Sequence, residues 1–131
     1  MDGAQFNFSS SAFADPAERI EENVNGMEGH ALASWLSGEL RARALDTSEV
    51  WAEDHGWDLS VAHGGAKYVI ACLIEREEGE TPSGSVVIGK PRSLMDKLRG
   101  RNLFEPGDPV AAAIEAALTA HPGVSGLTRE T

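Results

Sequence analysis

The stretch EDHGWDLSVAHGGAKYVIACLIE, residues 53–75, constrains the fold of this chain more than any other. A Gly-Gly pair separates two apolar runs, and glycine adopts at little cost the positive φ angles that a two-residue hairpin turn needs. The register set by this turn pairs His63 with Ala66, Val61 with Tyr68, Leu59 with Ile70, Trp57 with Cys72 and His55 with Ile74. Apolar residues then gather on one face, which predicts a hairpin whose second strand is central in a sheet.

Helical patterns lie on both sides of this hairpin. Residues 27–45 repeat leucine every four positions, which is the spacing of one helix face. A short helix is predicted between Ser93, a good N-cap, and Gly100, a common C-terminal stop. A longer helix is predicted to start with Asp108 as its N-cap and Pro109 as its first residue.

Two further segments show the alternation of strands. SVVIGK, residues 85–90, predicts a third strand antiparallel to the second, and FNFSSSAF near the N-terminus predicts an edge strand. The chain is therefore expected to form one α+β domain, 1–131, in which 1–26 supply an edge strand and a loop. The predicted architecture is a two-layer sandwich, with helices packed on one face of a three- to four-stranded antiparallel meander.

Charge is distributed unevenly along the chain. The net charge is −10 at pH 7, and residues 1–80 hold 16 acids and 5 bases, whereas residues 81–131 hold 5 acids and 6 bases. A net charge of this size disfavours adhesion to nucleic acid or to an anionic membrane and favours a basic partner. Five of the eleven bases form a basic cluster within twelve residues: Lys90, Arg92, Lys97, Arg99 and Arg101.

The sequence also restricts the cellular compartment in which the protein is expected and the cofactors that it is expected to bind. No run approaches the roughly 18 apolar residues of a membrane span, and the N-terminus lacks the basic and apolar regions of a signal peptide. A single cysteine excludes an internal disulfide and a multi-cysteine zinc site, so a reducing cytoplasm is expected. His55 and His63 lie too far apart along one strand to share a metal, and Cys72 is expected in the core. We therefore expect no catalytic residue, no metal and no cofactor.

The chain resembles a family of small bacterial proteins. The resemblance rests on the segments FNFSSSAF, ALASWLSGELRARALD, AEDHGWDLSV and AALTAHPGVSGLTRE, and it covers residues 6–130. It implies a single bacterial, cytoplasmic domain. The family pattern has an aromatic residue where His55 stands and another near Leu127, so this chain departs from it at two points. The resemblance implies no activity, and no functional residue is carried over from it.

Acids are concentrated at the start of the first hairpin strand and just after the second. An antiparallel hairpin places these two segments at the same end of a sheet, so their side chains are expected to share one edge. The predicted acidic edge consists of Glu53, Asp54, His55, Asp58, Glu77, Glu78 and Glu80. Such an edge would speed the capture of a basic partner by electrostatic steering.

Small size, high acidity and the absence of a recognisable catalytic motif favour a non-enzymatic function. The leading hypothesis is a small acidic, cytoplasmic protein-binding module of the inhibitor or immunity type, which binds a basic partner protein. A second hypothesis is a housekeeping domain that forms a homodimer through an open sheet face. A third is a small-molecule or RNA binder that uses the basic cluster of residues 90–101, although nucleic acid is a less favoured partner and a membrane is not expected.

Overall fold

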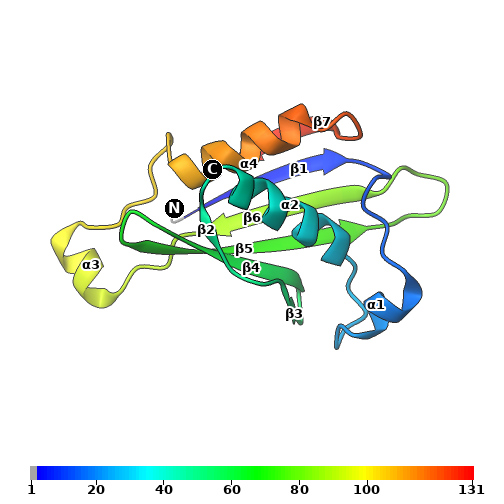
Figure 1. Ribbon diagram of the computed structural model, residues 1–131, viewed down its shortest axis with the longest axis horizontal. Helices are drawn as coiled ribbons and strands as arrows, with labels where there is room; N and C mark the ends of the chain where they lie inside the picture. The colour runs from blue at the N-terminus through cyan, green and yellow to red at the C-terminus, as the bar shows by residue number, and fades with distance from the viewer. Residues whose placement is uncertain (1–2) are drawn as a thin grey trace.

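The computed structural model describes residues 3–131 and contains one large sheet crossed by two long helices (Figure 1). The strands are β1 (Gly3–Ser9), β2 (Asp46–Thr47), β3 (Trp51–Glu53), β4 (Gly56–His63), β5 (Ala66–Glu75), β6 (Ser83–Gly89) and β7 (Ser125–Glu130). The helices are α1 (Ala17–Glu21), α2 (His30–Ala42), α3 (Leu94–Arg99) and α4 (Pro109–Ala120). None of these described helices is long and apolar enough to cross a membrane. All strand pairs are antiparallel in the order β2-β4-β5-β6-β1-β7, and β3 also pairs with β4.

This architecture contradicts the predicted three- to four-stranded meander. Seven antiparallel strands form one sheet that dominates the fold, and four helices of 5 to 13 residues accompany it. Two of the unforeseen strands, β2 and β3, have only two and three residues, which is too short to show alternation. β7 pairs with β1, so the two ends of the chain meet in a contact that no local pattern encodes. β1 therefore lies between β6 and β7 and is not the edge strand that the sequence predicted.

The predicted hairpin register is confirmed between β4 and β5. The strands pair as expected from the Gly-Gly turn to Trp57 and Cys72, and the two turn glycines have φ angles of 60° and 79°. The last predicted pair, His55 with Ile74, is wrong, because His55 lies in the turn between β3 and β4. Glu28, from the segment before α2, pairs with Ile74 instead.

α2 receives its N-terminal cap from a residue far upstream. Gly29 occupies the N-cap position and offers no side chain to the helix. The carboxylate of Asp15 accepts the N–H groups of Gly29, His30 and Ala31 at 3.1, 2.8 and 2.7 Å. These are among the donors that the first turn of a helix leaves unpaired, and a negative charge there also suits the helix dipole. The loop before α1 therefore fixes the start of α2.

α2 and α4 lie across the same face of the sheet, which we call the covered face (Figure 1). Alternate residues of the central strands point toward them and are buried. These core residues include Phe6, Leu59, Val61, Tyr68, Ile70, Cys72, Val86 and Ile88 from the sheet, Leu32, Leu36 and Leu40 from α2, and Val110, Ile114 and Leu118 from α4. The burial of Cys72 confirms its expected place in the core. Tyr68 donates a hydrogen bond of 2.7 Å to Asp108, which caps α4 and so links that helix to the sheet.

Candidate functional site: the uncovered sheet face

The opposite face of the sheet, which we call the uncovered face, is defined by the residues that alternate with the buried ones. One row across it, from β3 to β7, consists of Trp51, Asp58, Ala71, Val87, Gln5 and Glu130. Trp51 and Val87 are exposed, and Val69, Ala71 and Leu73 of the central strand are only half-buried. Because α2 and α4 occupy the other face, these apolar side chains are directed away from the main core.

The charges on the uncovered face are almost all negative. The register places five carboxylates and one base there: Asp46, Glu53, Asp58, Glu75, Glu130 and Lys67. All of these carboxylates except Asp58 are at least partly exposed. The apolar strip is therefore bordered by acids, an arrangement that complements a positively charged surface.

A depression of about 450 Å³ opens on the uncovered face over β1, β5 and β6. Its lining includes the side chains of Gln5, Asn7, Ser9, Leu73, Glu75, Ser83 and Ser85. Amide and hydroxyl oxygens accept hydrogen bonds, and Glu75 adds an exposed carboxylate. The depression therefore offers several acceptors and a negative charge to an entering ammonium or guanidinium group.

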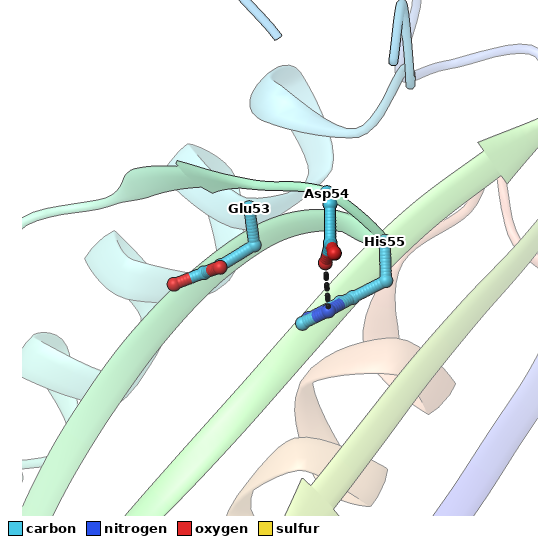
Figure 2. A group of neighbouring side chains, drawn as sticks. All are labelled: Glu53, Asp54 and His55. Carbon is cyan, nitrogen blue, oxygen red and sulfur yellow. Dashed lines mark ion pairs between the residues drawn. The ribbon is translucent and has the colours of Figure 1, made fainter. Parts of the chain in front are cut away.

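The turn between β3 and β4 places an imidazole between two carboxylates. His55 Nε2 lies 2.8 Å from Asp58 Oδ1, and His55 Nδ1 lies 3.3 Å from Asp54 Oδ1. Figure 2 shows the Asp54 carboxylate directed at the His55 ring, with Glu53 beside them at the end of β3. An imidazole that faces a carboxylate at both nitrogens is arranged to donate from both, as the protonated form does. A metal ligand needs a free nitrogen lone pair, so this geometry favours an ion pair over metal binding.

The His55 and Asp58 side chains titrate as a linked pair. Partial burial lowers the pKa of His55, but hydrogen bonds and charges from Asp58 and Asp54 outweigh it, so the pKa lies above the ordinary histidine value. Asp58 is only 4% exposed, and this burial raises its pKa despite the opposing hydrogen bond from His55. The neighbouring charges of Glu53 and Asp54 raise it further. One end of the uncovered face therefore changes its charge with pH.

The predicted acidic edge is divided into two groups by the segment of residues 23–28. Asn23 Nδ2 donates to the backbone oxygens of Glu53 and Gly56 at 2.7 and 2.9 Å, while Glu28 pairs with β5. Arg76 forms its ion pair with Glu28 at 2.6 Å. The structure thus brings together the group of Glu53, Asp54, His55 and Asp58. It places Glu77, Glu78 and Glu80 apart from them, exposed in the loop between β5 and β6.

The predicted basic cluster is partly engaged in holding its own segment in place. Its internal contacts are Lys90 Nζ to Leu103 O (3.2 Å), Arg92 Nε to Arg101 O (2.9 Å) and Arg101 Nε to Asp96 Oδ1 (3.9 Å). Lys97 and Arg99 are exposed on α3. A nucleic-acid or phosphate site formed by all five bases is therefore less favoured than the sequence suggested.

Sequence reasoning missed three residues of the uncovered face: Trp51, Glu75 and Val87. Trp51 belongs to β3, whose three residues carry no readable pattern. A usable signal did exist for Val87, because extending the hairpin register to the third strand would have placed it opposite Ala71 on this face. The same alternation along β5 would have assigned Glu75.

No protein-family model, no curated protein and no solved structure matches this chain. The resemblance to small bacterial proteins therefore remains an expectation. The fold and the surface together define a class: an antiparallel sheet with helices on one face and an acidic, partly apolar opposite face. The function is argued from the chemistry of that face.

Proposed function

We propose that this protein is a non-enzymatic binding module of the inhibitor or immunity type, whose uncovered face binds a basic partner protein. The observation that carries the proposal is the composition of this face, where five carboxylates and one lysine surround a partly exposed apolar strip. Protein interfaces commonly combine an apolar, aromatic centre with a charged rim. The sign of the rim selects the charge of the partner.

The uncovered face is also a rigid surface on which to build an interface. Its central strands β1, β4, β5 and β6 bury alternate residues in the core beneath α2 and α4, so the backbone at the centre of the face is fixed by the core. The indole N–H of Trp51 donates to Glu53 Oε1 at 2.8 Å, which orients the ring beside the acidic turn. A preorganised surface loses little conformational entropy on binding, and exposed tryptophan is frequent among the residues that dominate binding energy.

The depression over β1, β5 and β6 supports the same proposal. A lysine or arginine of the partner that enters it would meet the Glu75 carboxylate together with serine and amide oxygens. Hydrogen bonds between an ionised donor and a carboxylate are about twice as strong as neutral ones. The depression thus supplies a specific anchor for a basic side chain, in addition to the general attraction of the rim.

The experiment is affinity capture from the host with three versions of the chain, followed by mass spectrometry. One triple variant removes three exposed or partly exposed carboxylates of the uncovered face (Glu53→Gln, Glu75→Gln, Glu130→Gln). The matched control removes three carboxylates of the β5–β6 loop (Glu77→Gln, Glu78→Gln, Glu80→Gln). Both lose three negative charges. We expect the wild type and the loop variant to retain the same basic protein, and the face variant to lose it. Equal retention by the two variants would reject the uncovered face as the binding surface.

A homodimer through the uncovered face is the second candidate, favoured by the exposure of Trp51 and Val87. In a two-fold symmetric dimer each copy uses the same patch. Five carboxylates of one copy would then face five of the other, which opposes association at low salt. Sedimentation over a range of salt concentrations separates the candidates, because a homodimer would strengthen as salt screens this repulsion.

A further inference from the structure

A second unusual surface lies at one end of the molecule, where α3 projects from the sheet (Figure 1). We call residues 90–103 the α3 segment. α3 buries none of its side chains, and Leu94 and Leu98 are 75% and 73% exposed. They lie four residues apart and so share one face of the helix. Met95 and Leu103 are also exposed, so four large apolar side chains of one short segment remain in water.

The α3 segment is held in this form by its own hydrogen bonds. Ser93 and Asp96 form a reciprocal capping box, and Gly100 ends the helix with a φ of 62°. Arg92 donates to the backbone oxygens of Arg101 and Asp96. A short helix that buries nothing has little other support, since helices this short are unstable by themselves. The caps and the Arg92 hydrogen bonds therefore keep α3 helical while its apolar face is exposed to solvent.

The charge of the α3 segment is opposite to that of the rest of the chain. It contains five bases and one acid, whereas the remaining residues contain six bases and twenty acids. Lys97 and Arg99 are exposed on the helix itself. α3 lies at one end of the long axis of the molecule (Figure 1). At 0.1 M salt, charges separated by more than about 10 Å are largely screened from one another, which weakens the influence of distant acids at this end. A surface that approaches α3 therefore meets mainly positive charge.

We propose that the α3 segment docks on an anionic lipid membrane surface, into which Leu94, Met95 and Leu98 insert while Lys97 and Arg99 contact lipid phosphates. Interfacial helices combine these two features, an apolar face in the acyl boundary and cations at the headgroups. The long aliphatic stems of lysine and arginine let their charged groups reach the lipid headgroups while the helix itself lies deeper, at the boundary of the acyl chains. A projecting helix fits a fluid surface, whereas a protein partner would need a matching cavity. Binding through one short helix is reversible and depends on both features together.

The test is co-sedimentation of the full chain with lipid vesicles in about 0.1 M salt, where the charge of the acidic body is screened. Vesicles of phosphatidylcholine with about one third phosphatidylserine should retain the protein, and vesicles of phosphatidylcholine alone should retain much less. Lys97→Gln with Arg99→Gln should weaken partitioning about thirtyfold, from about 1 kcal/mol for each cation near the surface. Leu94→Ser with Leu98→Ser should abolish it. Val24→Ser removes an equally exposed apolar side chain elsewhere and should change nothing.

Thermal unfolding of each variant checks that it is folded, and no change is expected because α3 buries no side chain. The proposal is overturned if anionic vesicles do not retain the protein, or if neutral vesicles retain it equally well. It is also overturned if soluble polyglutamate binds in an α3-dependent manner while vesicles do not, because the partner would then be an acidic polypeptide. Retention that survives both α3 variants would assign the membrane contact to another surface. None of these results depends on the partner of the uncovered face.

Discussion

The uncovered face and the α3 segment both present apolar side chains among charges, but they differ in sign and in support. The uncovered face is acidic and is the reverse side of the core sheet, so its central strands β1, β4, β5 and β6 are also fixed by buried residues. The α3 segment is basic and its helix is held by caps and local hydrogen bonds, while Lys90 at its start contacts Asp108 of the body at 3.9 Å. The comparison suggests a rule for substitutions. A substitution in the core sheet that supports the uncovered face should alter the stability of the whole domain, whereas a substitution in the projecting α3 segment should leave the rest of the fold unaffected.

The largest expected effect on stability comes from replacing a leucine with aspartate in the core sheet, compared with the same replacement on α3. Leu59→Asp places a charge at a fully buried position between α2 and the sheet and should cost more than about 4 kcal/mol, which is enough to unfold many domains. Leu98→Asp makes the same change on α3 and should alter the free energy of unfolding by less than about 0.5 kcal/mol. Denaturant titration measures both. Similar costs would show that α3 packs against the body in solution.

A companion substitution tests the two faces of the sheet. Ser60 is the neighbour of Leu59 on β4 and points to the uncovered face, so Ser60→Asp should be tolerated within about 1 kcal/mol. Equal damage from Ser60→Asp and Leu59→Asp would mean that both faces are covered in solution, and the proposed binding surface would not exist.

The next largest effect on stability concerns α2, one of the two helices that pack on the covered face. Asp15→Ala removes the acceptor of three N–H groups at the start of α2 and should destabilise the domain by about 2 kcal/mol. Asp46→Ala removes an exposed carboxylate from β2 and serves as the control, with an expected cost below about 0.5 kcal/mol. Equal unfolding midpoints for the two variants would contradict the remote cap.

Two glycines with nearly the same backbone angle provide a sharper comparison. Gly64, in the β4–β5 turn, has a φ of 60°, and Gly100, at the end of α3, has a φ of 62°. Alanine at either position should cost about 1 kcal/mol locally, because it disfavours this conformation. For Gly64→Ala the cost should appear in global unfolding. For Gly100→Ala it should appear only as faster amide hydrogen exchange within the α3 segment, and a lowered global midpoint would show that α3 unfolds together with the core.

The smallest expected effect is a pH dependence at His55. Its folded-state pKa is raised, so its stabilising contribution is complete below the unfolded value of about 6.5 and is lost as pH rises through the folded pKa. The side chain is 54% exposed, so solvent screening limits the contribution to less than about 1 kcal/mol. The stability difference between wild type and His55→Gln should shrink from pH 5.5 to pH 8.5, as followed by denaturant titration. A difference that is constant over this range would contradict the pairing with Asp58.

The uncovered face should bind its basic partner faster on the alkaline side of the same transition. Loss of the imidazolium charge leaves the carboxylates of Asp54 and Asp58 less compensated, which strengthens the attraction. Association rates measured at two pH values test this. In the His55→Gln variant the pH dependence of the rate should disappear.

Local features of this protein were determined by the sequence itself. The Gly-Gly turn and the period-two pattern specified the β4–β5 register, because a shift of one residue would expose the whole apolar face. The predicted caps are also confirmed, at Ser93 and Gly100 for α3 and at Asp108 for α4. Caps and turns depend on residues within a few positions of one another, so a single sequence is sufficient to locate them.

The tertiary structure decided everything that joins distant segments. Only the folded chain pairs β7 with β1, caps α2 with Asp15 and inserts residues 23–28 between the two groups of acids. It also decides which apolar residues remain in water, since Leu98 repeats the helical spacing of a core leucine and nevertheless stays exposed. The physical reason is that burial and strand pairing depend on which surfaces meet across long separations in the chain. Alternation or helical periodicity indicates only that one face of a strand or helix is apolar, and not what covers that face.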